Sequence, residues 1–104
     1  MTNWLLSWNE NKFDWGYDYE YDCEQATKET PVILTWSCCS PKIQIGDEVF
    51  LIRLGKNPRG IIGHGVVTED VFQEEHWDEE KATQGKKAYY VEAEYGTLVN
   101  YRHL

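Results

Sequence analysis

The sequence predicts a small α+β protein that is mostly β: a pseudo-barrel of about five or six short strands with small helices. Three observations support this prediction. The chain has 104 residues, enough for one domain over residues 1–104. Its composition, 41% hydrophobic and 14% aromatic, is too apolar for a disordered chain. Its apolar runs are short and separated by turn-forming residues, which is typical of strands.

The first predicted strand covers residues 4–8, an apolar run that ends at the turn signal Asn9-Glu10-Asn11. The next segment, residues 13–21, carries an aromatic side chain at every odd position, and a period of two indicates a strand. However, Gly16 interrupts this run, and residues 18–28 contain good helix formers. A loop leading into a short helix therefore remains open as an alternative to the strand.

Pro31 ends any preceding helix, and residues 32–37 are apolar and β-branched, which favours a strand. The clearest element covers residues 45–54. There a turn at Gly46-Asp47 leads into a nearly continuous apolar run, which is typical of a buried central strand.

Residues 55–59 are rich in turn formers and precede a second β run, residues 60–68. Two strands joined by so short a loop predict a hairpin. Three glycines lie in the second run, and a glycine inside a strand usually marks a bulge, a barrel corner or a close approach. Residues 69–84 are polar and acidic and predict no regular element, whereas residues 88–95 predict a last strand.

The formal net charge of −8 argues against a nucleic-acid or anionic membrane partner, because the average field repels phosphate. The charge is unevenly distributed, however. Residues 1–30 and 64–104 each carry a net charge of −5, whereas residues 31–63 carry +2. A basic middle segment can still meet a phosphate backbone locally, because salt screens the acidic ends beyond about 8 Å.

The chain start lacks the features of a secretory signal, and no apolar run approaches the roughly 20 residues of a membrane span, so we expect a cytoplasmic protein without a membrane partner. Cys23, Cys38 and Cys39 show no zinc-binding spacing and are expected to be buried thiols. The short signatures of hydrolases, phosphate loops and metal helices are missing. We therefore expect no catalysis, no metal and no cofactor.

The five tryptophans exceed what a core of this size requires. Trp8, Trp15 and Trp36 are each predicted at the end of an element, beside polar groups such as Asn9 and Ser37. Aromatic rings that line a cleft can stack on a flat π-system, while neighbouring polar groups bind its edge. This arrangement indicates a pocket for a planar base.

Three segments in this order resemble the EVE domain of the PUA-like superfamily: GDEVF at 46–50, GIIGHGVV at 60–67 and YVEAEY at 90–95. Trp8-Asn9 with Phe13 and Trp15, the step at 36–38 and the pair His76-Trp77 are more narrowly similar to the EVE-like modules fused to HNH nucleases in modification-dependent restriction. The resemblance covers about residues 4–98. Such modules generally continue with a further strand or helix, so a chain that ends at Leu104 is expected to be a C-terminally shortened member.

The resemblance implies a PUA-like pseudo-barrel that reads a base flipped out of nucleic acid, most often a modified cytosine in DNA. Any cleavage would then belong to a fused or separate nuclease. In this chain the resemblance places the base pocket at Trp8, Asn9, Trp15, Trp36 and Ser37. It implies phosphate contacts, which position the strand without reading its sequence, at Arg53, Lys56 and Arg59. The acidity of the chain favours the alternative, a protein-interaction module such as a phage or mobile-element protein that binds or inhibits a nuclease.

Overall fold

The computed structural model of the chain describes residues 2–9, 11, 15, 18–38, 40–55 and 59–101. These residues form six strands and two helices: β1 (Asn3–Asn9), α1 (Asp18–Gln25), β2 (Val32–Cys38), β3 (Glu48–Leu54), β4 (Gly60–Val67), β5 (Phe72–Glu75), α2 (Glu79–Thr83) and β6 (Lys87–Leu98).

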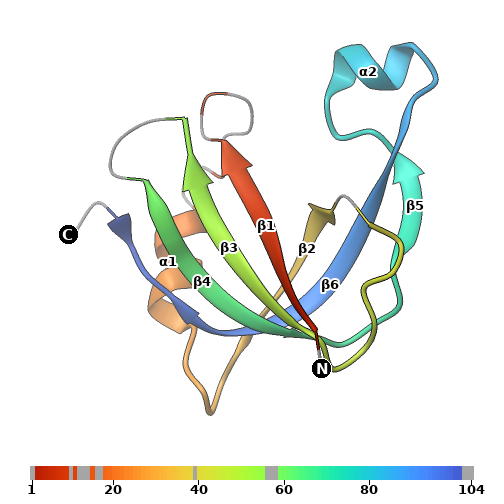
Figure 1. Cartoon of the computed structure of the whole chain (residues 1–104). Helices are drawn as coiled ribbons and strands as arrows, with labels where there is room; N and C mark the ends of the chain where they lie inside the picture. The colour runs from red at the N-terminus through yellow and green to blue at the C-terminus, as the bar shows by residue number, and fades with distance from the viewer. Residues whose placement is uncertain are drawn as a thin grey trace.

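All six strands belong to one sheet, in the order β1-β3-β4-β6-β2, and β5 also pairs with β6. The sheet curls into a half-barrel, as Figure 1 shows. β1 runs parallel to β3, while β3 and β4 form the predicted antiparallel hairpin. The prediction of a mostly β, α+β pseudo-barrel is thus confirmed, and none of the described helices is long and apolar enough to cross a membrane.

The curl of the sheet has local causes at the glycines of β4. The register between β4 and β6 shifts between His64 and Gly65, and a bulge of this kind bends a strand. A Cβ atom on Gly65 would lie 2.9 Å from the carbonyl oxygen of Glu94. Gly65 therefore allows β4 and β6 to cross more closely than any side chain would permit, which is one of the roles expected for these glycines.

The helices and β5 show what residues 18–25 and 69–84 form. Residues 18–25 are helical, so the interpretation as a loop leading into a helix is right for them, while Phe13 and Tyr17 lie outside the described residues. The polar stretch 69–84, for which we expected no element, contains β5 and α2. Every residue of β5 is exposed, so its sequence lacks a hydrophobic pattern, and the strand forms because its backbone pairs with β6.

The core has an aliphatic part between the sheet strands and an aromatic part next to α1. The aromatic part, here called the aromatic cluster, comprises Trp8, Trp15, Tyr19, Trp36 and Tyr101. Trp8 packs edge-on against Trp15, with 5.2 Å between the ring centroids, and Trp15 packs against Trp36 at 4.9 Å. Tyr19 fixes the C-terminal segment, since its hydroxyl donates to the Val99 carbonyl oxygen at 2.6 Å. Each aromatic ring pair in the cluster contributes about 0.5–1.5 kcal/mol to stability beyond the burial of its apolar area.

The turn before β3 is held to the start of β1 by the buried carboxylate of Asp47. Its Oδ2 accepts hydrogen bonds from Trp4 Nε1 and from the Gln44 backbone N–H, both at 2.9 Å. The Thr2 backbone N–H donates to Oδ1 at 3.3 Å. These donors, with the Gln44 N–H contributing most, lower the pKa of Asp47 below its ordinary value of 3.8.

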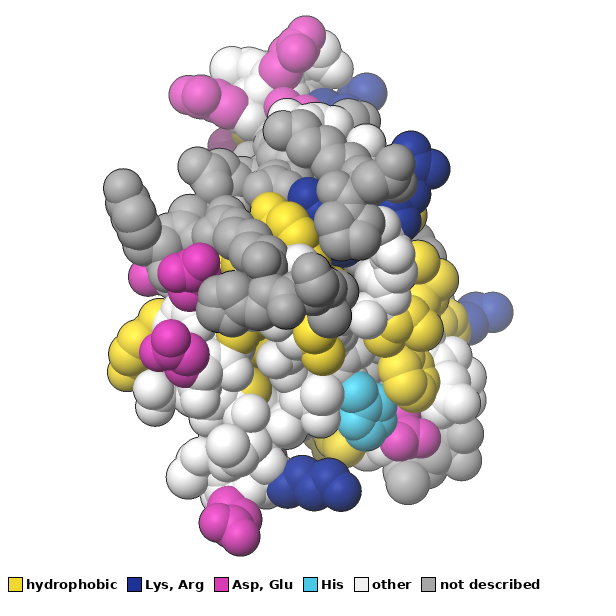
Figure 2. Space-filling view, turned by 90° about the vertical axis from the view of Figure 1, so that its left-hand side faces the viewer, with side chains coloured by type: hydrophobic (Ala, Val, Ile, Leu, Met, Phe, Trp, Pro, Cys, Tyr) yellow, Lys and Arg dark blue, Asp and Glu magenta, His cyan; other side chains and the backbone are white. Residues whose placement is uncertain are grey.

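The outer face of the half-barrel mixes apolar and charged groups. Leu5, Ile61 and Val66 are exposed on the outward side of β1 and β4. On the same side, His64 Nε2 lies 2.9 Å from Glu48 Oε1. Figure 2, which faces the side of β4 and α1, shows hydrophobic side chains beside a histidine and several separate acidic groups.

Candidate functional site

β1 and β2 are the two ends of the sheet order, and the seam between them is where the half-barrel stays open. One side chain bridges this seam: the indole Nε1–H of Trp36, on β2, donates to the Ser7 carbonyl oxygen of β1 at 2.8 Å. The seam is therefore joined by a side chain instead of a strand ladder. This leaves a concavity above the joined edges.

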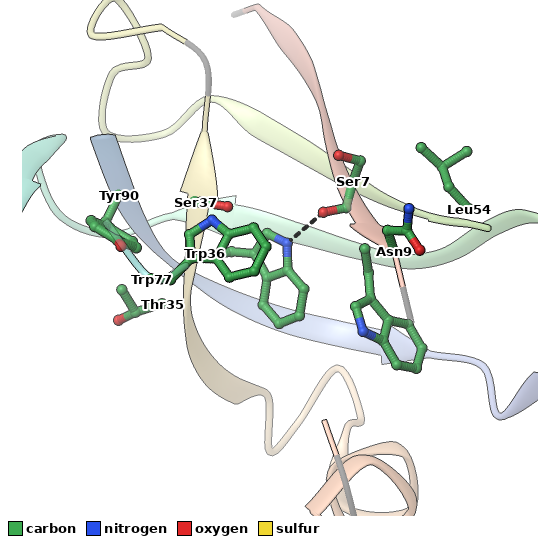
Figure 3. Close-up of a pocket in the computed structure, with 9 residues that line it drawn as sticks. Ser7, Asn9, Thr35, Trp36, Ser37, Leu54, Trp77 and Tyr90 are labelled. Atoms are coloured by element: carbon green, nitrogen blue, oxygen red, sulfur yellow. Dashed lines mark hydrogen bonds between the residues drawn. The ribbon is translucent and has the colours of Figure 1, made fainter. Parts of the chain in front are cut away.

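A pocket of about 340 Å³ lies at this seam, within the size range of small-ligand sites. Residues from both edges, from β3, from β6 and from the segment before α2 line it: Ser7, Trp8, Asn9, Thr35, Trp36, Ser37, Leu54, Trp77 and Tyr90. We call it the seam pocket. In Figure 3 the indole of Trp36 lies between the two edges, with Ser37 and Thr35 on one side and Ser7 and Asn9 on the other.

Four of the five residues predicted for the base pocket, Trp8, Asn9, Trp36 and Ser37, line the seam pocket. They come from β1 and β2, which are far apart in sequence and meet only across the seam. Trp15 is placed differently. It is buried, as Trp8 is, and packs against Trp8 and Trp36, and its indole N–H donates to Asp22 at 3.1 Å. Trp15 therefore supports two pocket rings from behind and does not line the pocket.

The segment before α2 supplies a ring that the sequence prediction did not assign to the pocket, Trp77. The hydroxyl of Tyr90 holds this segment, because it donates to the Glu75 carbonyl oxygen at 2.9 Å and accepts the backbone N–H of Trp77. Burial raises the pKa of Tyr90 above its ordinary value of 10.0. The only sequence signal for Trp77 was the isolated His76-Trp77 pair in a polar stretch.

The expected phosphate contact at Arg53 needs correction. Arg53 is 1% exposed, and its guanidinium carbon lies 3.6 Å from the centroid of the Tyr101 ring and 5.9 Å from that of Trp8. The register explains the burial, since Arg53 pairs with Trp8 and shares its inward-facing side. A cation stacked on rings in the core stabilises the fold and is not available to a phosphate at the surface.

The other two expected phosphate contacts lie at the β3–β4 loop. Arg59 is exposed, and Lys56 lies outside the described residues. This loop begins beside the pocket, because a Cβ atom on Gly55 would approach Asn9 Oδ1 to 2.5 Å. The positive φ of Gly55, 92°, also favours glycine there. Arg59 therefore follows a loop whose first residue contacts a pocket residue.

The residues that line the seam pocket are uncharged. They offer the indole rings of Trp36 and Trp77, the hydroxyls of Ser7, Thr35, Ser37 and Tyr90 and the amide of Asn9, while the third indole, that of Trp8, is only 2% exposed. Across the described part of the chain, no group of three or more His, Cys, Asp or Glu side chains could hold a metal ion. Cys23 and Cys38 are thiols, both half-buried, and Cys39 lies outside the described residues. The chemistry of the pocket is therefore that of stacking and neutral hydrogen bonding.

Comparison with known proteins does not place the chain in a family: no family model, no curated protein and no solved structure matches it.

Proposed function

We propose that the protein is a non-catalytic reader that binds a modified base, a modified cytosine in DNA, in the seam pocket. The observation that supports this most directly is the set of side chains that line the seam pocket. Indole rings line an open pocket of about 340 Å³, its other lining groups are hydroxyls and an amide, and none of the lining residues is charged. A neutral planar heterocycle needs a surface to stack on and partners for its edge, and this set provides both.

The electrostatics around Trp8 favour a neutral ring over a cationic ligand. Aromatic pockets also bind methylated ammonium groups, whose charge is attracted to the ring faces. Here the Arg53 guanidinium already lies 5.9 Å from the Trp8 ring centroid. A cation in the seam pocket would lie close to this buried like charge in a poorly solvated environment, which disfavours it.

Stacking alone does not provide enough free energy for such a reader to bind a duplex. Base stacking on an aromatic ring contributes about 1–3 kcal/mol, and flipping a base out of a duplex costs a few kcal/mol. These two terms nearly cancel, so binding to a duplex needs additional phosphate contacts. Of the residues expected to make them, Arg59 is the one that the structure describes at the surface.

The test is a binding titration with duplexes that differ at one cytosine, which is unmodified, methylated or hydroxymethylated. Trp77→Ala should remove the preference for the modified base, because the Trp77 ring lines the seam pocket. The ring is 40% exposed, so its removal should not open the core. Tyr21→Ala, on the exposed face of α1, is the matched aromatic control. Equal and negligible binding to every duplex would refute the proposal.

A second pair of variants tests the phosphate contact. Arg59→Ala should weaken all duplexes alike and reduce the salt slope by about one, as expected for one lost phosphate contact. Lys42→Ala, an exposed lysine in the turn between β2 and β3, should leave the slope unchanged. A normal slope for Arg59→Ala would show that the phosphates are held elsewhere.

The second candidate function is a module that binds a basic partner protein. It is favoured by one observation: exposed carboxylates gather on β5 and on the first turn of α2, at Glu74, Glu75, Glu79 and Glu80. Under this alternative, reversing two of these charges should abolish capture of a cationic partner, whereas Trp77→Ala should not affect it.

A further inference from the structure

A second cavity of about 250 Å³ adjoins the seam pocket and shares Ser7, Ser37 and Trp77 with it. We call it the side cavity. Its remaining lining comes from β1, β2, β6 and the segment before α2: Leu5, Leu6, Cys38, Ala88 and His76. The two hollows thus follow one another along the same seam, and a ligand in one can extend into the other.

The side cavity differs from the seam pocket in chemistry. It offers the hydroxyls of Ser7 and Ser37, the imidazole of His76 and the ring of Trp77, and none of the residues that line it is an Asp, Glu, Lys or Arg. The Asp78 backbone N–H donates to His76 Nδ1 at 3.0 Å. In the neutral imidazole this leaves the proton on Nε2, where it can be donated to a ligand oxygen.

The side cavity is much larger than a methyl group. A volume of about 250 Å³ is roughly eight times the 30 Å³ that one water molecule occupies in the liquid. Hydroxyls and an imidazole would gain nothing from a methyl group, whereas a monosaccharide presents hydroxyls to them and an apolar face of C–H groups to an indole ring.

We propose that the side cavity binds a hexose attached to the base that occupies the seam pocket. This inference rests on the proposed function, and it narrows the ligand from modified bases in general to a glycosylated base, such as a glucosylated hydroxymethylcytosine. Trp77 contacts both parts of the ligand, since it lines both cavities.

The test uses four duplexes that differ at a single cytosine: unmodified, methylated, hydroxymethylated and glucosylated. The wild-type protein should bind the glucosylated duplex about tenfold more tightly than the methylated one, the gain expected from one or two additional neutral hydrogen bonds. Equal or weaker binding of the glucosylated duplex would overturn the assignment of the side cavity while leaving the reader function intact.

Two matched variants separate the cavities. Ala88→Leu fills the side cavity and should remove the gain for the glucosylated duplex, with the affinity for the methylated duplex unchanged. Thr35→Leu fills the seam pocket from an exposed strand position and should weaken every modified duplex. Circular dichroism checks that both fold. If Ala88→Leu folds poorly, His76→Leu provides the same test by removing the imidazole donor.

Two other results of these titrations would contradict the hexose assignment. If Ala88→Leu weakens all four duplexes equally, the side cavity holds the sugar-phosphate backbone, and the hexose assignment is wrong. If no duplex binds to the wild-type protein, the proposed function itself fails, and the hexose assignment fails with it.

Discussion

Two buried tyrosines offer a matched test of how the core treats hydroxyl groups. Tyr19 and Tyr95 are both 0% exposed. The hydroxyl of Tyr19 donates to the Val99 carbonyl oxygen at 2.6 Å and accepts the Tyr101 backbone N–H at 3.0 Å. The hydroxyl of Tyr95 has no hydrogen-bond partner among the residues that the structure describes. The same change, tyrosine to phenylalanine, should therefore have opposite effects at the two positions.

The magnitudes follow from these contacts. Tyr19→Phe removes the hydrogen bonds to Val99 and Tyr101 and leaves these two backbone groups without them, so the free energy of unfolding should fall by about 1–3 kcal/mol. Tyr95→Phe removes a polar group that is buried without compensation, and stability should rise by about 1 kcal/mol, the lower end of that desolvation penalty. Each kcal/mol corresponds to a shift of roughly 4–8 °C in the melting temperature of a domain of this size.

The assay is urea unfolding of the wild-type protein and both variants, followed by tryptophan fluorescence and by circular dichroism. Near-UV circular dichroism confirms that the aromatic cluster keeps its packing. A change of the same sign in both variants would contradict the reasoning, because it would show that the hydrogen bonds of the Tyr19 hydroxyl do not distinguish it from that of Tyr95.

Three further predictions concern the sheet and the titratable groups. Gly65→Ala should lower the unfolding free energy by about 1–3 kcal/mol in urea titrations through overpacking against Glu94, whereas Gly96→Ala, where a Cβ would meet its nearest neighbour at 3.5 Å, should be nearly neutral. The Asp47 carboxylate, whose pKa is lowered in the folded protein, stabilises the fold at pH values above its unfolded pKa of 3.8. This contribution is lost as the pH falls through the folded pKa, so the stability difference between wild type and Asp47→Asn should shrink below about pH 4. Burial raises the pKa of the Tyr19 and Tyr95 phenols above 10.0, so their contribution to stability should be constant below that pH and decrease above it. In an alkaline unfolding titration the double phenylalanine variant should therefore show a shallower fall in stability than the wild type.

The local elements with a strong hydrophobic pattern or clear turn chemistry could be predicted from the sequence. The apolar run of β3, its Gly46-Asp47 turn and the short loop to β4 fixed the hairpin, because register and pairing of neighbouring strands depend on residues close in sequence. It also indicated four of the nine residues of the seam pocket, since indole rings beside small polar groups are unusual in a core. β5 could not be predicted, because an exposed strand on a sheet edge has no pattern of its own.

Which rings line the pocket and which charge is buried depends on contacts between residues far apart in the sequence, so these features could not be predicted. Trp8, Trp15 and Trp36 look alike in the sequence, yet Trp8 and Trp15 are both buried, at 2% and 8% exposure, and pack against Tyr19 of α1. Of these two rings only Trp8 lines the seam pocket. Arg53 follows an apolar run near a loop, which predicts exposure, but its register with Trp8 turns it inward onto Tyr101. Contacts between β1, β2 and the segment of Trp77 depend on the curl of the whole sheet. For this reason the pocket is a property of the fold and not of any one segment.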